Sequence, residues 1–259
     1  MSLQCGIVGL PNVGKSTLFN ALSNAEIDAE NYPFCTIEPN VGIVAVPDKR
    51  LDQIIGLVRP KNSIPTTVKF VDIAGLVSGA SKGEGLGNKF LAHIRETQAI
   101  IHVVRCHGDE DVIHVDGKVD PISDIGTIDT ELSLADLDSL AKAITKAAKE
   151  SKTGDKVANK KLAMLNQLHD LVATSPLRRH VLESDLLELA KTMSLLTIKP
   201  IIYVANTSES MSDGEMENLA KVESFAKNEN SVVLSVCAKL EAEISTLSLE
   251  DKKSFLAEM

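Results

Sequence analysis

A glycine-containing segment near the N-terminus constrains the fold more than any other feature of the chain. The apolar run that ends at Val8 leads into Gly9-Leu10-Pro11-Asn12-Val13-Gly14-Lys15-Ser16-Thr17, followed by residues with good helical character. This GxxxxGKS pattern, between a strand and a helix, is typical of a phosphate-binding loop. Backbone N–H groups and the helix N-terminus surround the anion in such a loop. The pattern predicts that Lys15 reaches the terminal phosphates of a nucleotide and that Ser16 ligates Mg²⁺. The predicted nucleotide-binding residues of this loop are Asn12, Val13, Gly14, Lys15, Ser16 and Thr17.

Short apolar runs recur along the chain and predict its fold class. Six runs rich in Val and Ile lie at residues 5–8, 41–46, 68–71, 100–104, 201–205 and 232–236. Several lack polar alternation, which is typical of strands buried on both faces. Longer amphipathic stretches separate them. We therefore expect an α/β fold with a mostly parallel sheet covered by helices.

One interval, between Arg105 and Pro200, contains no convincing strand. Apolar residues recur there at steps of three and four, first at Leu137, Leu140, Ile144 and Ala147 and later at Leu182, Leu186, Leu189, Met193 and Leu196. They predict long helices with narrow apolar seams, packed as a coiled-coil-like α-helical hairpin. Turns are expected at 151–155 and 175–176. The predicted division is a P-loop nucleotide-binding domain over 1–130 and 198–259, with a helical insertion at 131–197.

Charge is distributed unevenly along the chain. The 27 basic and 36 acidic residues give a net charge of −9, which excludes a generally basic nucleic-acid coat, and we expect no DNA binding. Residues 139–182, however, carry nine basic and three acidic residues, a net +6. This stretch is either a solvated helical face or a basic arm that binds RNA phosphates.

The N-terminal sequence and the spacing of the cysteines indicate the cellular compartment of the protein. The chain has no apolar run of 18 residues and no secretory signal, so we expect no membrane association. Its four cysteines are far apart and form no CxxC pair. They indicate reduced thiols in the cytoplasm, and neither a disulfide framework nor a zinc site.

The run at 68–71 ends in a second phosphate-related motif, Asp72-Ile73-Ala74-Gly75. An Asp at the end of a neighbouring strand can hold a Mg²⁺-bound water, and the N–H of Gly75 can reach a γ-phosphate. Between the two motifs lies a proline-bounded loop whose Thr36 can complete the metal shell. The predicted metal ligands are thus Ser16, Thr36 and Asp72.

The later strands are expected to supply the base-reading elements. Asn206-Thr207-Ser208-Glu209 follows the run at 201–205, and Cys237-Ala238-Lys239 follows the next one. A guanine site usually reads Asn-Lys-x-Asp, whereas here Thr207 and Glu209 occupy the lysine and aspartate positions. An Asn amide can pair bidentately with adenine. The sequence thus favours ATP over GTP, with Asn206 as the reader and Thr207 and Glu209 nearby.

On these motifs the chain resembles the YchF/Obg-like ATPase family, a branch of the translation-factor-related P-loop GTPases. The matching segments are 9–17, 31–40, 72–76, 79–88 and 206–209, and the resemblance spans the whole chain. It implies a Ras-like nucleotide domain with a helical insertion, ATP preferred over GTP, and association with the ribosome and its RNA. Family members normally continue into a β-rich TGS domain. Because the chain ends at Met259, the resemblance implies that this domain is missing.

The expected activity is slow ATP hydrolysis that serves as a regulatory switch. Ras-like enzymes orient the attacking water with a glutamine after the DxxG motif, but this position is Leu76. The family resemblance suggests a histidine at 109–115, so His114 joins Lys15 and Gly75 as a catalytic candidate. A K⁺ ion held by Asn12 is a second candidate for positioning the attacking water.

Two alternatives remain open, and a third is disfavoured. The first is a GTP-specific GTPase of the same fold in which Glu209 accepts from guanine. The second is an RNA- or ribosome-binding module whose hydrolysis is incidental. A metabolic kinase is disfavoured, because only Arg178-Arg179 could supply the arginines of a lid.

Overall fold

A computed structural model describes residues 3–23, 40–73, 86–108, 119–152 and 155–258. It contains a six-stranded sheet in the order β2-β3-β1-β4-β5-β6. The strands are β1 (Leu3–Val8), β2 (Val41–Ala45), β3 (Thr67–Asp72), β4 (Ala99–Arg105), β5 (Ile201–Asn206) and β6 (Val232–Val236). Neighbouring strands are parallel except for the antiparallel pair β2–β3. The predicted α/β fold with a mostly parallel sheet is confirmed, and each predicted run forms a strand.

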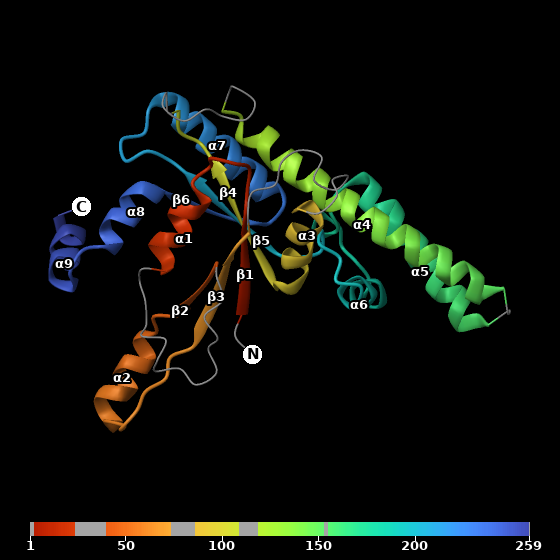
Figure 1. Cartoon of the computed structure of the whole chain (residues 1–259), viewed down its shortest axis with the longest axis horizontal. Coiled ribbons are helices and arrows are strands. Elements are labelled where there is room, and N and C mark those ends of the chain that lie inside the picture. The colour runs from red at the N-terminus through yellow and green to blue at the C-terminus, as the bar shows by residue number, and fades with distance from the viewer. Residues whose placement is uncertain (1–2, 24–39, 74–85, 109–118, 153–154, 259) are drawn as a thin grey trace.

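Helices cover both faces of this sheet (Figure 1). Helices α1 and α8 lie against one face, and α3, α4 and α7 lie against the other. The helices of the described residues are α1 (Lys15–Ser23), α2 (Lys49–Val58), α3 (Leu86–Glu96), α4 (Pro121–Ser151), α5 (Lys156–Thr174), α6 (Ser184–Thr192), α7 (Asp213–Asn228), α8 (Ala238–Ser245) and α9 (Leu249–Glu258), with a 3-10 turn at Leu177–Arg179. None of these helices has a stretch that is both long and apolar enough to cross a bilayer.

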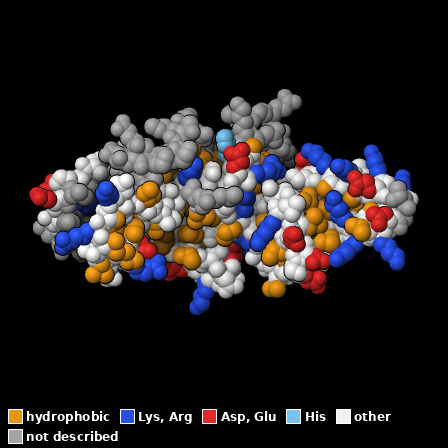
Figure 2. Space-filling model, turned by 90° about the horizontal axis from the view of Figure 1, so that it is seen from below, with side chains coloured by type: hydrophobic (Ala, Val, Ile, Leu, Met, Phe, Trp, Pro, Cys, Tyr) orange, Lys and Arg blue, Asp and Glu red, His pale blue; other side chains and the backbone are white. Residues whose placement is uncertain are grey.

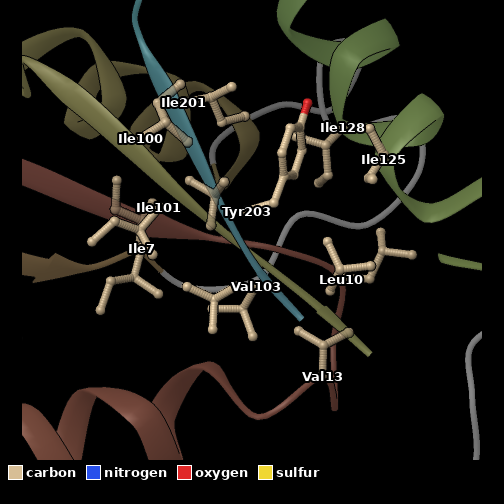
Figure 3. Close-up of a cluster of buried hydrophobic side chains, with 14 of the residues drawn as sticks. Ile7, Leu10, Val13, Ile100, Ile101, Val103, Ile125, Ile128, Ile201 and Tyr203 are labelled. Atoms are coloured by element: carbon tan, nitrogen blue, oxygen red, sulfur yellow. The ribbon is translucent and has the colours of Figure 1, made fainter. Parts of the chain in front are cut away.

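The main hydrophobic core lies directly beneath the phosphate-binding loop (Figure 3). Ile7 and Val103 come from the two central strands and are at most 1% exposed. Ile125 and Ile128 of α4 pack against the same cluster, together with the ring of Tyr203. Because β1, β3, β4, β5 and β6 run in the same direction, their carboxyl ends meet at one edge of the sheet. Ligand sites of parallel α/β sheets form at this edge.

A second cluster of buried apolar side chains holds the helical hairpin together. It comprises Leu140, Ala147, Leu165, Leu168, Val172, Leu177, Leu186, Ala190 and Leu195. Helix α4 belongs to both clusters, since its first half packs on the sheet and its second half packs on α5. The hairpin of α4 and α5 extends away from the sheet (Figure 1). The domain boundaries at 131 and 197 stay a prediction.

The hairpin differs from the expected one in its second helix. The apolar seam from Leu182 to Leu196 predicts a long helix, but this prediction is wrong, because α6 is only nine residues long. Ser194 adopts the left-handed conformation with a φ of 52°, which ends the helix before the seam is complete. The partner of α4 is α5, which begins where the Asp155 side chain accepts a hydrogen bond from the N–H of Val157 at 3.0 Å. The expected break at 175–176 ends α5.

Candidate functional site

The phosphate-binding loop has a backbone shape that only glycine permits at two positions. Gly9 and Gly14 have φ angles of 155° and 96°. A Cβ atom on Gly9 would lie 2.4 Å from the carbonyl oxygen of Val103, and one on Gly14 would lie 2.3 Å from the Asn206 amide nitrogen. Both glycines therefore let the loop pack closely against neighbouring strands.

Lys15 is the cation of this loop and lies at the first position of α1. Its side chain is buried, and Nζ donates a hydrogen bond to the carbonyl oxygen of Leu10 at 2.6 Å. Burial lowers the pKa of Lys15 to about 8, although the nearby Asp72 carboxylate opposes this shift. A buried ammonium group next to a helix N-terminus is suited to hold an anion such as a phosphate.

Ser16 and Asp72 are brought together as predicted. Ile7 of β1 is paired with Asp72 at the end of β3, so the carboxylate lies beside the loop. The Ser16 hydroxyl donates to Asp72 Oδ2 at 3.3 Å. The other oxygen, Oδ1, is buried and has no hydrogen-bond partner among the described residues.

These oxygen atoms fit a Mg²⁺ ion, which prefers one or two protein oxygens and completes its shell with water and phosphate. The described residues contain no group of three or more His, Cys, Asp or Glu side chains that could form a separate metal cage. Ser16 and Asp72 are therefore the residues of this part of the chain that would hold the ion.

A cavity of about 790 Å³ opens beside the loop. This volume lies within the range of about 300–1,000 Å³ that small-molecule sites occupy. The cavity brings together residues of four segments that are distant in the sequence: Asn12, Gly14 and Thr17; His107 and Gly108; Asn206, Thr207, Ser208, Glu209 and Ser210; and Cys237, Ala238, Lys239, Leu240 and Glu243. The phosphate loop and the predicted base-reading residues thus share one cavity.

Asn206 is a structural link between the walls of this cavity. It is 6% exposed, its Nδ2 donates to the carbonyl oxygen of Val13 at 3.0 Å, and its Oδ1 accepts from the N–H of Ala238 at 3.1 Å. Each end of the amide thus makes one hydrogen bond to the protein, and these two bonds hold the phosphate loop against α8. Because a side-chain amide has two N–H donors and two lone pairs on its oxygen, the contact of Asn206 with adenine stays a prediction.

Some residues that line the cavity belong to no sequence motif. His107 and Glu243 belong to this group. The position of His107, two residues after the end of β4, is a signal that could have identified it, because side chains at the carboxyl ends of parallel strands gather at one edge. Glu243 lies within α8, and no pattern around it indicates a site.

Three predicted site residues lie outside the part of the chain that the structure describes. They are Thr36, Gly75 and His114, and Leu76 lies outside it as well. Their predicted roles in metal binding, phosphate contact and catalysis stay predictions.

Comparisons with known proteins identify relatives of this chain. A family model described as 50S ribosome-binding GTPase matches residues 4–132. The ribosome-binding ATPase YchF of Haemophilus influenzae is 53% identical over 262 residues, an alignment that covers 100% of this chain and 71% of that protein. The protein of the same name from Bacillus subtilis is 52% identical and is covered over 72% of its length.

The fold agrees as well. The solved structure of the Schizosaccharomyces pombe YchF GTPase matches with a TM-score of 0.85 and 32% identity, over 99% of this chain and 71% of that one. The chain therefore spans somewhat more than two thirds of the length of these relatives. Sequence identity along its whole length and the shared fold together show that the chain belongs to the YchF family of P-loop NTPases.

Proposed function

We propose that this chain is a ribosome-associated NTPase of the cytoplasm that hydrolyses ATP, in preference to GTP, to ADP and phosphate as a slow regulatory switch. The observation that carries the proposal is the buried ammonium group of Lys15 inside a glycine-shaped loop, next to a cavity of nucleotide size. The names of the relatives support nucleotide hydrolysis but differ on the base, since two are called ATPases and one is called a GTPase. The base preference therefore rests on the residues of this chain.

The base-reading wall lacks the usual groups of a guanine site. Thr207 stands where the lysine would be, is 5% exposed, and lies with its hydroxyl 3.4 Å from that of Ser235. Glu209 lines the cavity and is exposed. A carboxylate at this position can accept from the amine of adenine, so Glu209 is compatible with ATP, and the replacement of the usual lysine by Thr207 is what favours ATP over GTP. The alternative is a GTPase in which Glu209 accepts from guanine, and displacement of bound ATP by GTP distinguishes the two.

The residues around the phosphates have distinct roles in the proposed reaction. Lys15 would hold the terminal phosphates, and Ser16 and Asp72 would hold Mg²⁺. When bound, Mg²⁺ neutralises charge on the phosphate oxygens. Thr36 and Gly75 contact the γ-phosphate in the triphosphate state and release it after hydrolysis.

A leucine at position 76 cannot orient the attacking water, so hydrolysis is slow without another group. His114 is one candidate for this role. A K⁺ ion near Asn12 is the other; Asn12 is exposed at the cavity and has a φ of 61°. Replacing Na⁺ by K⁺ in an ATPase assay separates the two, because only the second candidate requires K⁺.

The depressed pKa of Lys15 predicts proton uptake on nucleotide binding. Above about pH 8 part of the unliganded protein has neutral Lys15, whereas a bound triphosphate favours the ammonium form. MgATP affinity should therefore fall as the pH rises through 8. Titration calorimetry at pH 8.5, in two buffers of different ionisation enthalpy, should show net proton uptake that is much smaller at pH 7. Equal uptake at the two pH values would rule out this role of Lys15.

The helical hairpin is the proposed ribosome-binding element. Lys146, Lys149, Lys152, Lys156 and Lys161 are exposed on it, and Figure 2 shows basic side chains projecting from this end of the molecule. Arg178 and Arg179 do not belong to this surface, because they form ion pairs with Asp129 and Glu229. For the same reason they cannot serve as the arginines of a kinase lid. The basic arm thus consists of lysines, whose contacts with phosphates would carry no sequence information.

Charge reversal tests this element. Lys146→Glu, Lys149→Glu and Lys156→Glu together should weaken co-sedimentation with ribosomes and should reduce the salt dependence of binding by about one unit of slope per lost phosphate contact. Lys49→Glu, Arg59→Glu and Lys61→Glu form the matched control, because they change the same charge at exposed positions on and after α2. Equal losses in both triple variants would favour the solvated-face interpretation.

A further inference from the structure

One wall of the cavity is fixed by a buried carboxylate that no sequence motif identifies as part of the site. Glu215 lies in the first turn of α7 and is 8% exposed. Its Oε2 accepts a hydrogen bond from the Ser208 hydroxyl at 2.6 Å and one from the Ser208 N–H at 3.2 Å. Both the side chain and the backbone of Ser208 are therefore held by a single oxygen atom.

The hydrogen bonds of the Glu215 carboxylate differ from those of an ordinary helix cap. Ser212 is the N-cap of α7, and its hydroxyl accepts from the N–H of Glu215 at 3.4 Å. In the usual Ser-x-x-Glu capping box the glutamate side chain returns to the N–H of the N-cap residue. Here the carboxylate extends to Ser208, four residues before the cap. The start of α7 is thereby attached to the cavity wall.

Helix α7, which carries Glu215, is itself held in place by buried residues and a hydrogen bond. Val222 and Ala226 are fully buried in the main core. The Asn218 side chain donates to the carbonyl oxygen of Cys106, just after β4, at 3.1 Å. The positive end of the helix dipole also favours a negative charge in the first turn. Glu215 is thus an anionic acceptor held in place by the helix that carries it.

The hydrogen bonds of Thr207 and Ser208 determine the position of the next residue, Glu209. Thr207 is tied to β6, because its N–H donates to the carbonyl oxygen of Val236 at 3.0 Å. Ser208 is tied to α7. Glu209 comes next, and among the described residues its side chain has no hydrogen-bond partner, although it lines the cavity. Hydrogen bonds therefore fix the backbone at Thr207 and Ser208, the two residues before Glu209. The carboxylate of Glu209 itself is available to a ligand.

We propose that Glu215 is a positioning residue for the purine site, which sets the location of Glu209 through its two hydrogen bonds to Ser208. The inference rests on the proposed nucleotide function and deepens it, since it names the group that orients the base-reading wall. Glu215 does not contact the nucleotide itself. Its loss is expected to alter base recognition more than phosphate chemistry.

The test compares purine binding and turnover in matched variants. Glu215→Ala should bind MgATP about tenfold more weakly, which corresponds to about 1.4 kcal/mol, and should discriminate less between ATP and GTP. Its KM for ATP should rise by more than its kcat falls. Glu215→Gln keeps an acceptor oxygen and should restore most of the affinity. Ser208→Ala removes only the hydroxyl contact with Glu215, so it should weaken MgATP binding less than Glu215→Ala does. This variant tests the proposal if Glu215→Ala fails to fold.

Asp213→Ala is the control for an effect on the helix alone, because Asp213 is an exposed acidic residue in the same turn of α7. It should bind both purine nucleotides as the unmodified protein does. If Glu215→Ala binds ATP and GTP with unchanged affinities, or if Asp213→Ala is weakened equally, the positioning role is overturned. If the unmodified protein binds neither nucleotide, the proposed function fails, and the inference fails with it.

Discussion

Lys15→Ala is expected to weaken MgATP binding by about 30-fold to about 4,000-fold. The estimate comes from the roughly 2–5 kcal/mol that truncation of a buried, hydrogen-bonded charge costs, at about 1.4 kcal/mol for each factor of ten. Lys15 is 7% exposed and is positioned by its hydrogen bond to the carbonyl oxygen of Leu10. Among the described residues, Lys239 of α8 is the one lysine or arginine in the cavity lining, and Lys15 lies within the phosphate-binding loop itself. Loss of the Lys15 ammonium group therefore removes the positive charge that the loop provides for the phosphates.

Titration calorimetry of the variant against the unmodified protein measures this loss. Lys227→Ala is a suitable control, because Lys227 is exposed at the end of α7. Thermal unfolding of both variants should show that the fold is kept. If Lys15→Ala binds MgATP as tightly as Lys227→Ala does, the phosphates are held elsewhere.

The second large effect concerns stability. Asp129→Ala should lower the free energy of unfolding by about 3–5 kcal/mol, the typical result of removing one partner of a buried ion pair. Asp129 on α4 contacts Arg178 and Arg179, each at 2.5 Å, and its side chain is 7% exposed. Glu229 at the end of α7 contacts the same two arginines. Without Asp129, two guanidinium groups share one carboxylate in a mostly buried cluster.

Urea denaturation measures this loss, with Asp138→Ala as the matched control. Asp138 lies on the same helix and pairs with Lys142 at 2.6 Å, but both side chains are more than half exposed. An exposed pair contributes about 0–1 kcal/mol, so its loss should be small. Similar losses in the two variants would show that the buried ion pairs contribute no more to stability than an exposed pair does.

The sequence predicts the sheet well because each strand carries its own local signal. Runs of Val and Ile without polar alternation mark strands buried on both faces, and each of the six becomes a strand. Ser16 and Asp72 are also predictable, since their motifs place Ser16 after the loop that follows β1 and Asp72 at the end of β3. The structure adds that their side chains meet at 3.3 Å.

Contacts between distant segments could not be predicted in this way. No sequence motif identifies Glu215 as a site residue, and its hydrogen bond to Ser208 depends on the path of the loop before α7. The ion pairs of Arg178 with Asp129 and Glu229 join segments about 50 residues apart. Asn206 adds contacts that its motif does not predict, since its hydrogen bonds to Val13 and Ala238 hold two cavity walls together.

Titration calorimetry of the unmodified, folded protein with MgATP and with MgGTP tests the central claim most directly. The account predicts one saturable site for a purine triphosphate, with tighter binding of ATP than of GTP. Preferential binding of GTP would contradict the assignment of the base, and no heat of binding with either nucleotide would contradict the nucleotide site as a whole.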